Sequence, residues 1–290
     1  MNALALTRAS AIDSGVIAMK GGQLSSTSGA LISVNGGAGT VSIDSPDALV
    51  PGLVGGRTVL ASVTNSAAYA ADVDLALINA SNVIGDIDVT GADNILNASF
   101  TRSDWTGDFT GGGNTANLAL NAARWTGRAT GATAISVDAA SDWNITGSSD
   151  AQRVVNTGRV MFEHTPGNFR RLTTRDYIGS DGILGLNTLL GNDTSRSDQL
   201  VIDGGTASGT TKIIVNNAGG RGAQTTGDGI HIVGAISGGT TDPAAFQLAD
   251  RVAAGAYEYL LFRADCWRRG GDVYESRLHD SRDGSRGGGR

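Results

Sequence analysis

A tryptophan that returns at nearly equal intervals constrains this chain more than any other feature. Trp105, Trp125 and Trp143 lie 20 and then 18 residues apart, and each is followed within four residues by a glycine. Matching apolar segments, residues 117–120 and 134–137, lie between them. A repeat of about 20 residues is typical of solenoid proteins, in which each repeat forms one coil that is stable only against its neighbours. The repeat therefore predicts a solenoid.

Short apolar segments between turn-forming residues predict that each coil is built from β-strands. In these segments apolar and polar side chains alternate or β-branched residues predominate, and each is followed by Gly, Asn or Asp. Alternation places one face of a strand in the core and the other in water. The expected fold class is all-β, a right-handed parallel β-helix. The segments are residues 31–34, 40–43, 72–78, 85–90, 117–120 and 134–137.

Composition excludes a disordered chain, a collagen-like chain and a nucleic-acid-binding protein. Glycine provides 43 of the 290 residues but proline only 4, and 40% of the residues are apolar while 17% are charged. Disordered segments combine low hydrophobicity with high net charge, and collagen needs abundant proline with glycine at every third position. A nucleic-acid partner would need a basic surface, whereas the formal net charge is −6.

The residues that carry chemistry are few and scattered, so the sequence predicts no enzyme, no cofactor site and no metal site. The single cysteine, Cys266, has no disulfide partner within the chain. His164, His231 and His279 have no second ligand at metal-binding spacing. The sequence contains no Gly-x-Ser-x-Gly nucleophile motif.

Three segments resemble ligand-binding motifs only superficially. Asp198 and Asp203 are interpreted as turn residues and not as a general acid–base pair. Residues 204–212 are glycine-rich, but the lysine follows two threonines, which is the wrong order for a phosphate loop. Residues 227–229 offer one carboxylate, whereas Ca²⁺ takes six to eight oxygen ligands.

The repeat tryptophans have two interpretations that their exposure can separate. They can be core or half-exposed spacers, with the glycine that follows relieving the backbone at a corner. Alternatively, they can form an exposed, aligned stripe that binds carbohydrate. Burial of all three would exclude the stripe.

The two ends of the sequence also carry expectations. The N-terminal residues lack a basic segment followed by a long apolar core, and no run of 18 apolar residues occurs, so neither a signal peptide nor a transmembrane helix is expected. Residues 264–290 contain 11 Asp, Glu or Arg residues and end in Gly-Gly-Gly-Arg. We expect them to be a disordered tail of non-native origin, as after a frameshift.

A set of motifs follows in fixed order along the C-terminal part of the chain, at residues 167–173, 198–202, 207–210, 214–219, 229–233, 245–248 and 254–260. In order and spacing this set resembles the autochaperone region of pertactin-like autotransporter passengers. The tryptophan coils upstream resemble the passenger β-helix of that family more loosely. The resemblance implies type V secretion, a passenger that folds from its C-terminus, and a C-terminal segment that nucleates this folding and caps the solenoid.

The same resemblance implies an outer-membrane β-barrel translocator as partner. The sequence departs from the family because no amphipathic barrel strands follow Phe262, and we expect the gene product to be truncated. The implied location is the bacterial cell surface or outer membrane, or the medium after secretion through the periplasm. The protein is expected to be monomeric.

Large apolar residues are densest near the end of the resembling segment, and they are the expected core of the folding cap. The expected domains are β-helix coils at 1–152, the autochaperone cap at 153–263 and the tail at 264–290. The cap residues are Phe246, Leu248, Tyr257, Tyr259, Leu260 and Phe262.

The expected function is that of a structural stalk whose C-terminal part nucleates folding during outer-membrane translocation. One alternative is a surface adhesin that binds a host glycan or protein through the lateral face of the β-helix. The other is a passenger enzyme whose catalytic domain lies upstream of these residues.

Overall fold

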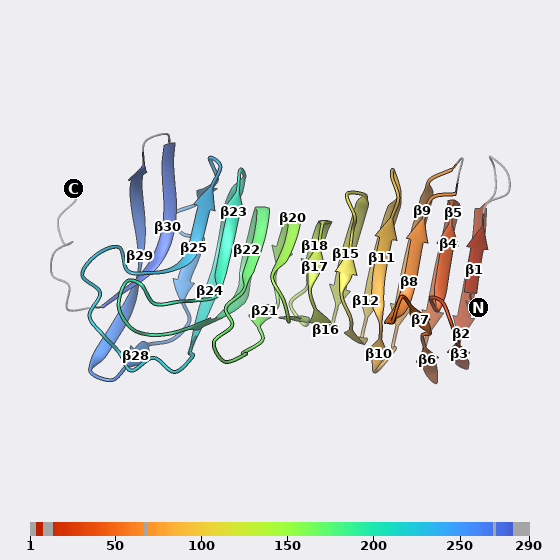
Figure 1. Ribbon diagram of the computed structural model, residues 1–290, viewed down its shortest axis with the longest axis horizontal. Coiled ribbons are helices and arrows are strands. Elements are labelled where there is room, and N and C mark those ends of the chain that lie inside the picture. The colour runs from red at the N-terminus through yellow and green to blue at the C-terminus, as the bar shows by residue number, and fades with distance from the viewer. Residues whose placement is uncertain (1–3, 8–13, 67–68, 269–270, 281–290) are drawn as a thin grey trace. The chain divides into compact units, whose positions relative to one another are not determined.

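The structure is a computed structural model that describes residues 4–7, 14–66, 69–268 and 271–280; the side chains of 264–276, 279 and 280 are not described. Every regular element in the described residues is a β-strand (Figure 1). Contacts divide the chain into two compact units. Unit 1 comprises residues 1–146 and 150–153, and unit 2 comprises residues 147–149 and 154–290. The predicted division at residue 152 into separate domains stays a prediction.

Three parallel ladders of strands build unit 1. The first ladder joins β1 (Leu4–Thr7), β4 (Ile32–Asn35), β8 (Arg57–Thr64), β11 (Asp86–Thr90), β14 (Phe109–Thr110) and β17 (Ala129–Thr130). The second joins β2 (Ser14–Lys20), β5 (Gly37–Asp44), β9 (Ala71–Ile78), β12 (Ile95–Thr101), β15 (Thr115–Asn121) and β18 (Ala132–Val137). The third joins β10 (Val83–Ile84), β13 (Asp104–Thr106), β16 (Arg124–Gly127) and β19 (Asp142–Ile145).

Successive strands of one coil belong to different ladders, and each strand pairs with the equivalent strand one coil later. This arrangement is a parallel β-helix, which confirms the predicted fold class, and Figure 1 shows the strands of the unit side by side in chain order. Two further short strand pairs occur in unit 1 outside the three ladders. Strand β3 (Gln23–Ser25) pairs with β6 (Ala48–Val50), and β7 (Leu53–Val54) forms an antiparallel pair with β8.

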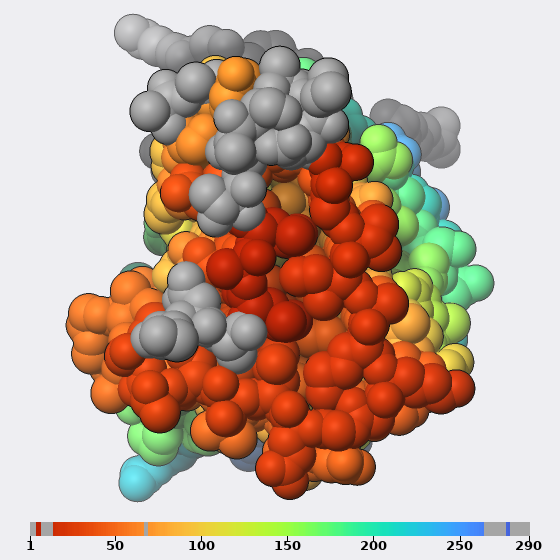
Figure 2. All heavy atoms as spheres, turned by 90° about the vertical axis from the view of Figure 1, so that its right-hand side faces the viewer, coloured from red at the N-terminus to blue at the C-terminus, as the bar shows by residue number. Residues whose placement is uncertain are grey.

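Inward side chains of unit 1 stack in columns from coil to coil. In the second ladder the register places Val41, Leu75, Ala98, Leu118 and Ile135 in one column, and all five are buried. Each fully buried Val, Leu or Ile contributes about 1.5–3 kcal/mol. Figure 2 shows the unit from its N-terminal end, where the side chains of the first coils pack against one another.

Unit 2 begins as parallel coils with longer strands. The parallel pairs join β21 (Arg159–Phe162) to β22 (Arg171–Thr188), β22 to β23 (Gln199–Asp203) and β24 (Thr206–Asn217), β23 to β25 (Ile230–Ile236), and β24 to β26 (Thr240–Thr241) and β27 (Phe246–Leu248). Strand β20 (Ser149–Asn156) contributes residues to both units.

An antiparallel hairpin ends unit 2. Strand β29 (Tyr257–Arg268) pairs with β28 (Val252–Ala254) and with β30 (Gly271–Asp280), and β30 also pairs antiparallel with β25. A parallel coil offers its unpaired backbone groups to another coil, which makes an open edge prone to further pairing. The change of strand direction therefore gives the edge of β25 a partner that belongs to the same unit.

The expectation of a disordered tail at 264–290 is wrong for the described part of that segment. Residues 264–268 continue β29, and 271–280 form β30, with backbone pairs from Tyr259↔Asp280 to Arg268↔Gly271. A charged composition does not prevent strand pairing, because ladder hydrogen bonds use backbone groups that every residue except proline carries. Arg277 and Leu278 of β30 are buried. The rest of the expected tail, 281–290, lies outside the described residues.

Candidate functional site

The repeat tryptophans form a buried stack inside unit 1. Trp105, Trp125 and Trp143 are 1%, 0% and 0% exposed. The ring centroids of neighbouring tryptophans are 5.1 and 4.7 Å apart, with interplanar angles of 6° and 7°. Phe100 extends the stack, 4.7 Å from Trp105. The alignment follows from the register of the third ladder, which pairs Trp105 with Trp125 and Trp125 with Trp143.

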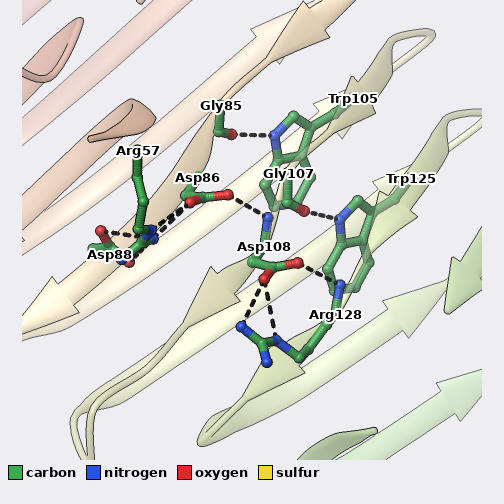
Figure 3. A network of polar contacts seen from close by, with 9 residues as sticks. All are labelled: Arg57, Gly85, Asp86, Asp88, Trp105, Gly107, Asp108, Trp125 and Arg128. Atoms are coloured by element: carbon green, nitrogen blue, oxygen red, sulfur yellow. Dashed lines mark hydrogen bonds and ion pairs between the residues drawn. The ribbon is translucent and has the colours of Figure 1, made fainter. Parts of the chain in front are cut away.

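Each tryptophan also binds the corner of the preceding coil. The indole Nε1 of Trp105 and that of Trp125 donate to the carbonyl oxygens of Gly85 and Gly107, each at 2.8 Å (Figure 3). The Nε1 of Trp143 donates to the carbonyl oxygen of Gly127 at 3.1 Å. These bonds satisfy a donor that would otherwise be buried without a partner.

Close packing explains the glycines that follow Trp105 and Trp125, whereas the equivalent position after Trp143 is Ile145, which pairs with Gly127. A Cβ atom on Gly107 would lie 2.2 Å from the carbonyl oxygen of Gly85, and one on Gly127 would lie 1.9 Å from that of Gly107. Any side chain would therefore push adjacent corners apart. The repeat that indicated a coil in the sequence therefore reflects two structural features, the stacked tryptophans and the closely packed glycine corners.

The burial of all three tryptophans shows that the carbohydrate-stripe interpretation is wrong. A sugar-binding ring must offer a face to solvent, whereas here the faces of the rings are covered by each other. Exposure could not be inferred from the sequence because the residue before each tryptophan is polar in all three repeats, as either interpretation allows.

A ladder of charged groups runs outside the same corner. The Asp86 carboxylate accepts from the backbone N–H of Asp108 at 2.8 Å, and the Asp108 carboxylate accepts from the N–H of Arg128 at 3.0 Å (Figure 3). Arg57 donates to both Asp86 and Asp88, at 2.6 and 3.0 Å. The hydrogen bonds that Arg57 donates to the Asp86 carboxylate are the largest cause that raises the pKa of Arg57.

The predicted cap residues do not form one buried cluster. Tyr259 is fully buried, and Phe246, Leu248 and Tyr257 are half-buried. Leu260 and Phe262 are 42% and 40% exposed, so their assignment to a buried core is wrong. A dense run of apolar residues in a strand sends alternate side chains to opposite faces, and the run itself does not say which face is covered.

The hydroxyl group of Tyr259 joins three distant segments of unit 2. It accepts from the backbone N–H of Ala223 at 3.0 Å, and the carbonyl oxygens of Ala223 and Gly191 lie 2.9 and 3.0 Å away as acceptors. Tyr259 and Gly191 are 68 residues apart in the chain. We call this contact, with the Asp193 loop described next, the Tyr259 junction.

The carboxylate of Asp193 fixes the loop that precedes β25. It accepts from the backbone N–H groups of Thr226, Gly227 and Gly229 at 3.0, 3.0 and 2.7 Å. Burial alone would raise the pKa of Asp193, but these N–H groups stabilise the charged form and hold its pKa below the usual value. Arg277 of β30 donates to the carbonyl oxygen of Asp228 in the same loop, which ties the terminal hairpin to it.

Two buried polar clusters hold the parallel coils of unit 2. Asp198 accepts from the backbone N–H of Arg170 and from the backbone and side-chain N–H groups of Asn187, at 2.7, 2.9 and 2.7 Å. Asn156 donates to the hydroxyl of Tyr177 at 3.0 Å, and burial raises the pKa of that hydroxyl. Asp198 is 1% exposed, so the turn-residue interpretation missed its role as a buried acceptor.

Candidate metal ligands do not gather in one place within the described residues. No group of three His, Cys, Asp or Glu side chains that could hold a metal ion occurs there. Across the same part of the chain, no helix has the length and apolar character needed to cross a membrane. Cys266 and His279, named in the sequence analysis, have side chains outside the described set.

We expect Trp125→Ala to lower the free energy of unfolding by about 3–5 kcal/mol, because it removes the middle ring of the stack and opens a cavity. Urea unfolding followed by far-UV circular dichroism measures this. Thr106→Ala, at an exposed position in the same ladder, is the matched control and should change stability by less than about 0.5 kcal/mol. A Trp125 variant as stable as the control would contradict the stacked interior.

Tyr259→Phe keeps the ring and removes only the hydroxyl of the Tyr259 junction. We expect a loss of about 1–3 kcal/mol, because the N–H of Ala223 is left without its acceptor. Limited proteolysis should show new cleavage within 189–229. Glu258→Gln, which weakens an exposed ion pair with Arg251, should behave like the wild type. Equal behaviour of the two variants would show that the hydroxyl contributes nothing.

The lowered pKa of Asp193 predicts a loss of stability in acid. A carboxyl group whose pKa is lower in the folded state stabilises the fold fully above its unfolded pKa of about 4, and this contribution disappears as the pH falls through the folded value. Asp193→Asn should therefore be less stable than the wild type at pH 7, and the difference should shrink below about pH 4. Urea midpoints at several pH values test this, with Asp203→Asn as an exposed control; a gap that persists in acid would refute it.

The chain is similar to a known protein family and to several known proteins. Residues 149–261 match the family model described as Autochaperone Domain Type 1. The chain is 43% identical over 114 residues to the adhesin BmaC autotransporter of Brucella suis biovar 1 (37% of this chain, 3% of that protein). It is 43% identical over 91 residues to the autotransporter adhesin AIDA-I of Escherichia coli (31% and 7%). It is 37% identical over 131 residues to the uncharacterized protein YuaQ of E. coli K12 (44% and 9%).

A solved structure, the Haemophilus influenzae Hap adhesin, aligns with 91% of this chain and 33% of its own at 14% identity and a TM-score of 0.36. The chain spans less than a tenth of the length of the three relatives named above. The matched family region begins at the start of β20 and includes the Asp198 cluster and the Tyr259 junction. Residues 149–261 are therefore an autochaperone domain of type 1, and the chain is a segment of an autotransporter passenger.

Proposed function

We propose that residues 149–261 fold first and serve as the nucleus and cap on which the upstream coils assemble, and that the coils form a structural stalk. The observation that carries this proposal is the Tyr259 junction, in which one hydroxyl contacts Gly191 and Ala223 at the C-terminal end of unit 2. Such long-range ties make a segment stable without a further coil beyond it.

The physical need for a nucleus comes from the solenoid itself. The first coil to form has no neighbour, so it orders its backbone without the stacking that stabilises later coils. Unit 2 reduces this obstacle in two ways. Its buried Asp198 and Tyr177 clusters join residues that are 11 to 28 positions apart, and its hairpin of β29 and β30 covers the edge of β25 with antiparallel pairing.

The autotransporter relatives imply a location at the outer membrane or cell surface and an outer-membrane translocator as partner in the full protein. We further propose that the passenger segment is monomeric and is not an enzyme. Support for the second point comes from the match to an autochaperone domain and from relatives that are named as adhesins.

Adhesion is the second candidate function. It is favoured by the names of two relatives, BmaC and AIDA-I, each of which is called an adhesin. The tryptophans cannot supply the contact, because they are buried. A ligand would have to use polar side chains of the lateral face, such as the exposed Asn97 and the half-buried Asn117, which are hydrogen-bonded to each other at 2.9 Å.

Deletion of residues 160–263 tests the nucleation role. We expect the remaining N-terminal coils to refold slowly and to be cleaved readily by protease, because the folding nucleus and cap are lost. Refolding from urea, sampled by brief proteolysis and mass spectrometry, measures both effects against the whole chain.

A fragment of residues 1–150 provides the converse test. If this fragment reaches a protease-resistant state as fast as the whole chain does, residues 149–261 are not needed as a nucleus. Binding of the whole chain to a host glycan array or host cell surface would, in contrast, support the adhesin alternative.

A further inference from the structure

Side chains at the corners of unit 1 accept hydrogen bonds from the coil before them. The backbone N–H groups of Ala71 and Asn94 donate to the side-chain oxygens of Asn94 and Asn114, at 2.7 and 3.0 Å. Those of Ala80 and Ala123 donate to the hydroxyls of Ser103 and Ser141, both at 3.0 Å. All four bonds are buried, and in each of them the acceptor lies 18 to 23 residues C-terminal to its donor.

The accepting side chains are held in place by their own turns. Asn114 Nδ2 donates to the carbonyl oxygen of Gly111 at 3.1 Å. Ser103 donates to the carbonyl oxygen of Thr101 at 3.0 Å, and Ser141 donates to Asp138 at 2.6 Å. These contacts span two or three residues, so they form with the turn itself and orient each acceptor before a neighbouring coil arrives.

Other side chains accept hydrogen bonds from the coil after them, and the N–H groups that donate to them are not fully buried. Asp108 accepts from Arg128, and Asn65 accepts from Ala92, but both N–H groups are exposed. Asp86 accepts from the N–H of Asp108, which is only partly buried. Water can replace an acceptor at such sites, whereas a buried N–H without a partner carries its full desolvation penalty.

We propose that the corners of unit 1 are set one coil at a time from the C-terminal side, with Asn94, Ser103, Asn114 and Ser141 acting as positioning residues for the coil before each of them. A formed coil presents an oriented side-chain oxygen toward its N-terminal neighbour and thereby fixes where that neighbour turns. The inference rests on the proposed function, because it describes how order that begins in residues 149–261 passes through residues 71–146.

The chain itself supplies a substitute that shows what a positioning residue requires. Where the coil after Asn114 turns, Thr133 accepts from the backbone N–H of Ala116 at 3.0 Å and donates to the carbonyl oxygen of Asn114 at 3.1 Å. A hydroxyl can therefore do the work of the amide. Threonine and valine have the same shape and differ in that hydroxyl, so they form a matched pair for position 114.

The test compares Asn114→Val and Asn114→Thr in the full chain by pulsed hydrogen exchange during refolding. In Asn114→Val we expect residues 71–98 to gain protection at least about tenfold more slowly, the effect of one unsatisfied buried donor. Residues 115–146 should keep their rate. Asn114→Thr should restore the rate of 71–98, and Asn117→Val, at a partly exposed asparagine, should have no effect.

Ser141→Ala makes a smaller change at a different coil, which keeps the test informative if Asn114→Val does not fold. We expect the delay to begin at residues 115–126 and to extend toward the N-terminus. The proposal is overturned if the delay falls on residues C-terminal to the substitution, falls equally on both sides, or is the same for valine and threonine. Failure of the nucleation role is distinguishable, because residues 154–262 would then not be the first to gain protection in the wild type.

Discussion

The need to pair every backbone group of a strand with the coil before and the coil after it governs this molecule. This need for backbone pairing is met differently in the interior of unit 1 and at the C-terminal end of unit 2. In the interior of unit 1, strands such as β12 are paired on both sides, to β9 and β15, and the side chains only have to stack. At the C-terminal end of unit 2 the parallel pairing does not continue, and the strands pair antiparallel. In the proposed function, the folding nucleus and the cap both depend on this antiparallel pairing, which covers a strand edge that no further coil pairs with.

Buried polar side chains specify the register between coils, which apolar packing alone cannot do. Stacked aliphatic residues would tolerate a slip along the column, because one leucine resembles the next. A carboxylate such as Asp198, which accepts three N–H groups, or an amide such as Asn114 tolerates no such slip. The buried hydrogen bonds therefore specify register, while the hydrophobic columns supply most of the stabilisation.

The fold class could be predicted from the sequence because the length of the sequence repeat equals the length of one coil. Trp105, Trp125 and Trp143 lie in register since their spacing equals a coil length, and the glycines after Trp105 and Trp125 mark a corner where a Cβ does not fit. The cap was predicted less well. Leu260 and Phe262 look like core in the sequence but lie on the open face of β29, and the role of Asp193 depends on residues 33 to 36 positions away. Contacts at that distance leave no local pattern. The pairing of residues 271–280 was missed for a related reason, since backbone ladders leave little trace in composition.

Unequal coils in unit 1 show how such a passenger can change length during evolution. The register offset between facing residues is 20 from Phe109 to Ala129, 17 from Asn117 to Ala134 and 18 from Trp125 to Trp143. The ladders keep their inward and outward faces throughout. The three residues lost between the offsets of 20 and 17 are absorbed at the corner where Gly131 and Thr133 stand in for the longer Gly111–Asn114 turn, and one residue is regained at the next corner, between Val137 and Asp142. A lineage can thus gain or lose residues at corners, or duplicate whole coils, without inverting a single strand. Changes in the number and length of coils are therefore nearly neutral for the architecture.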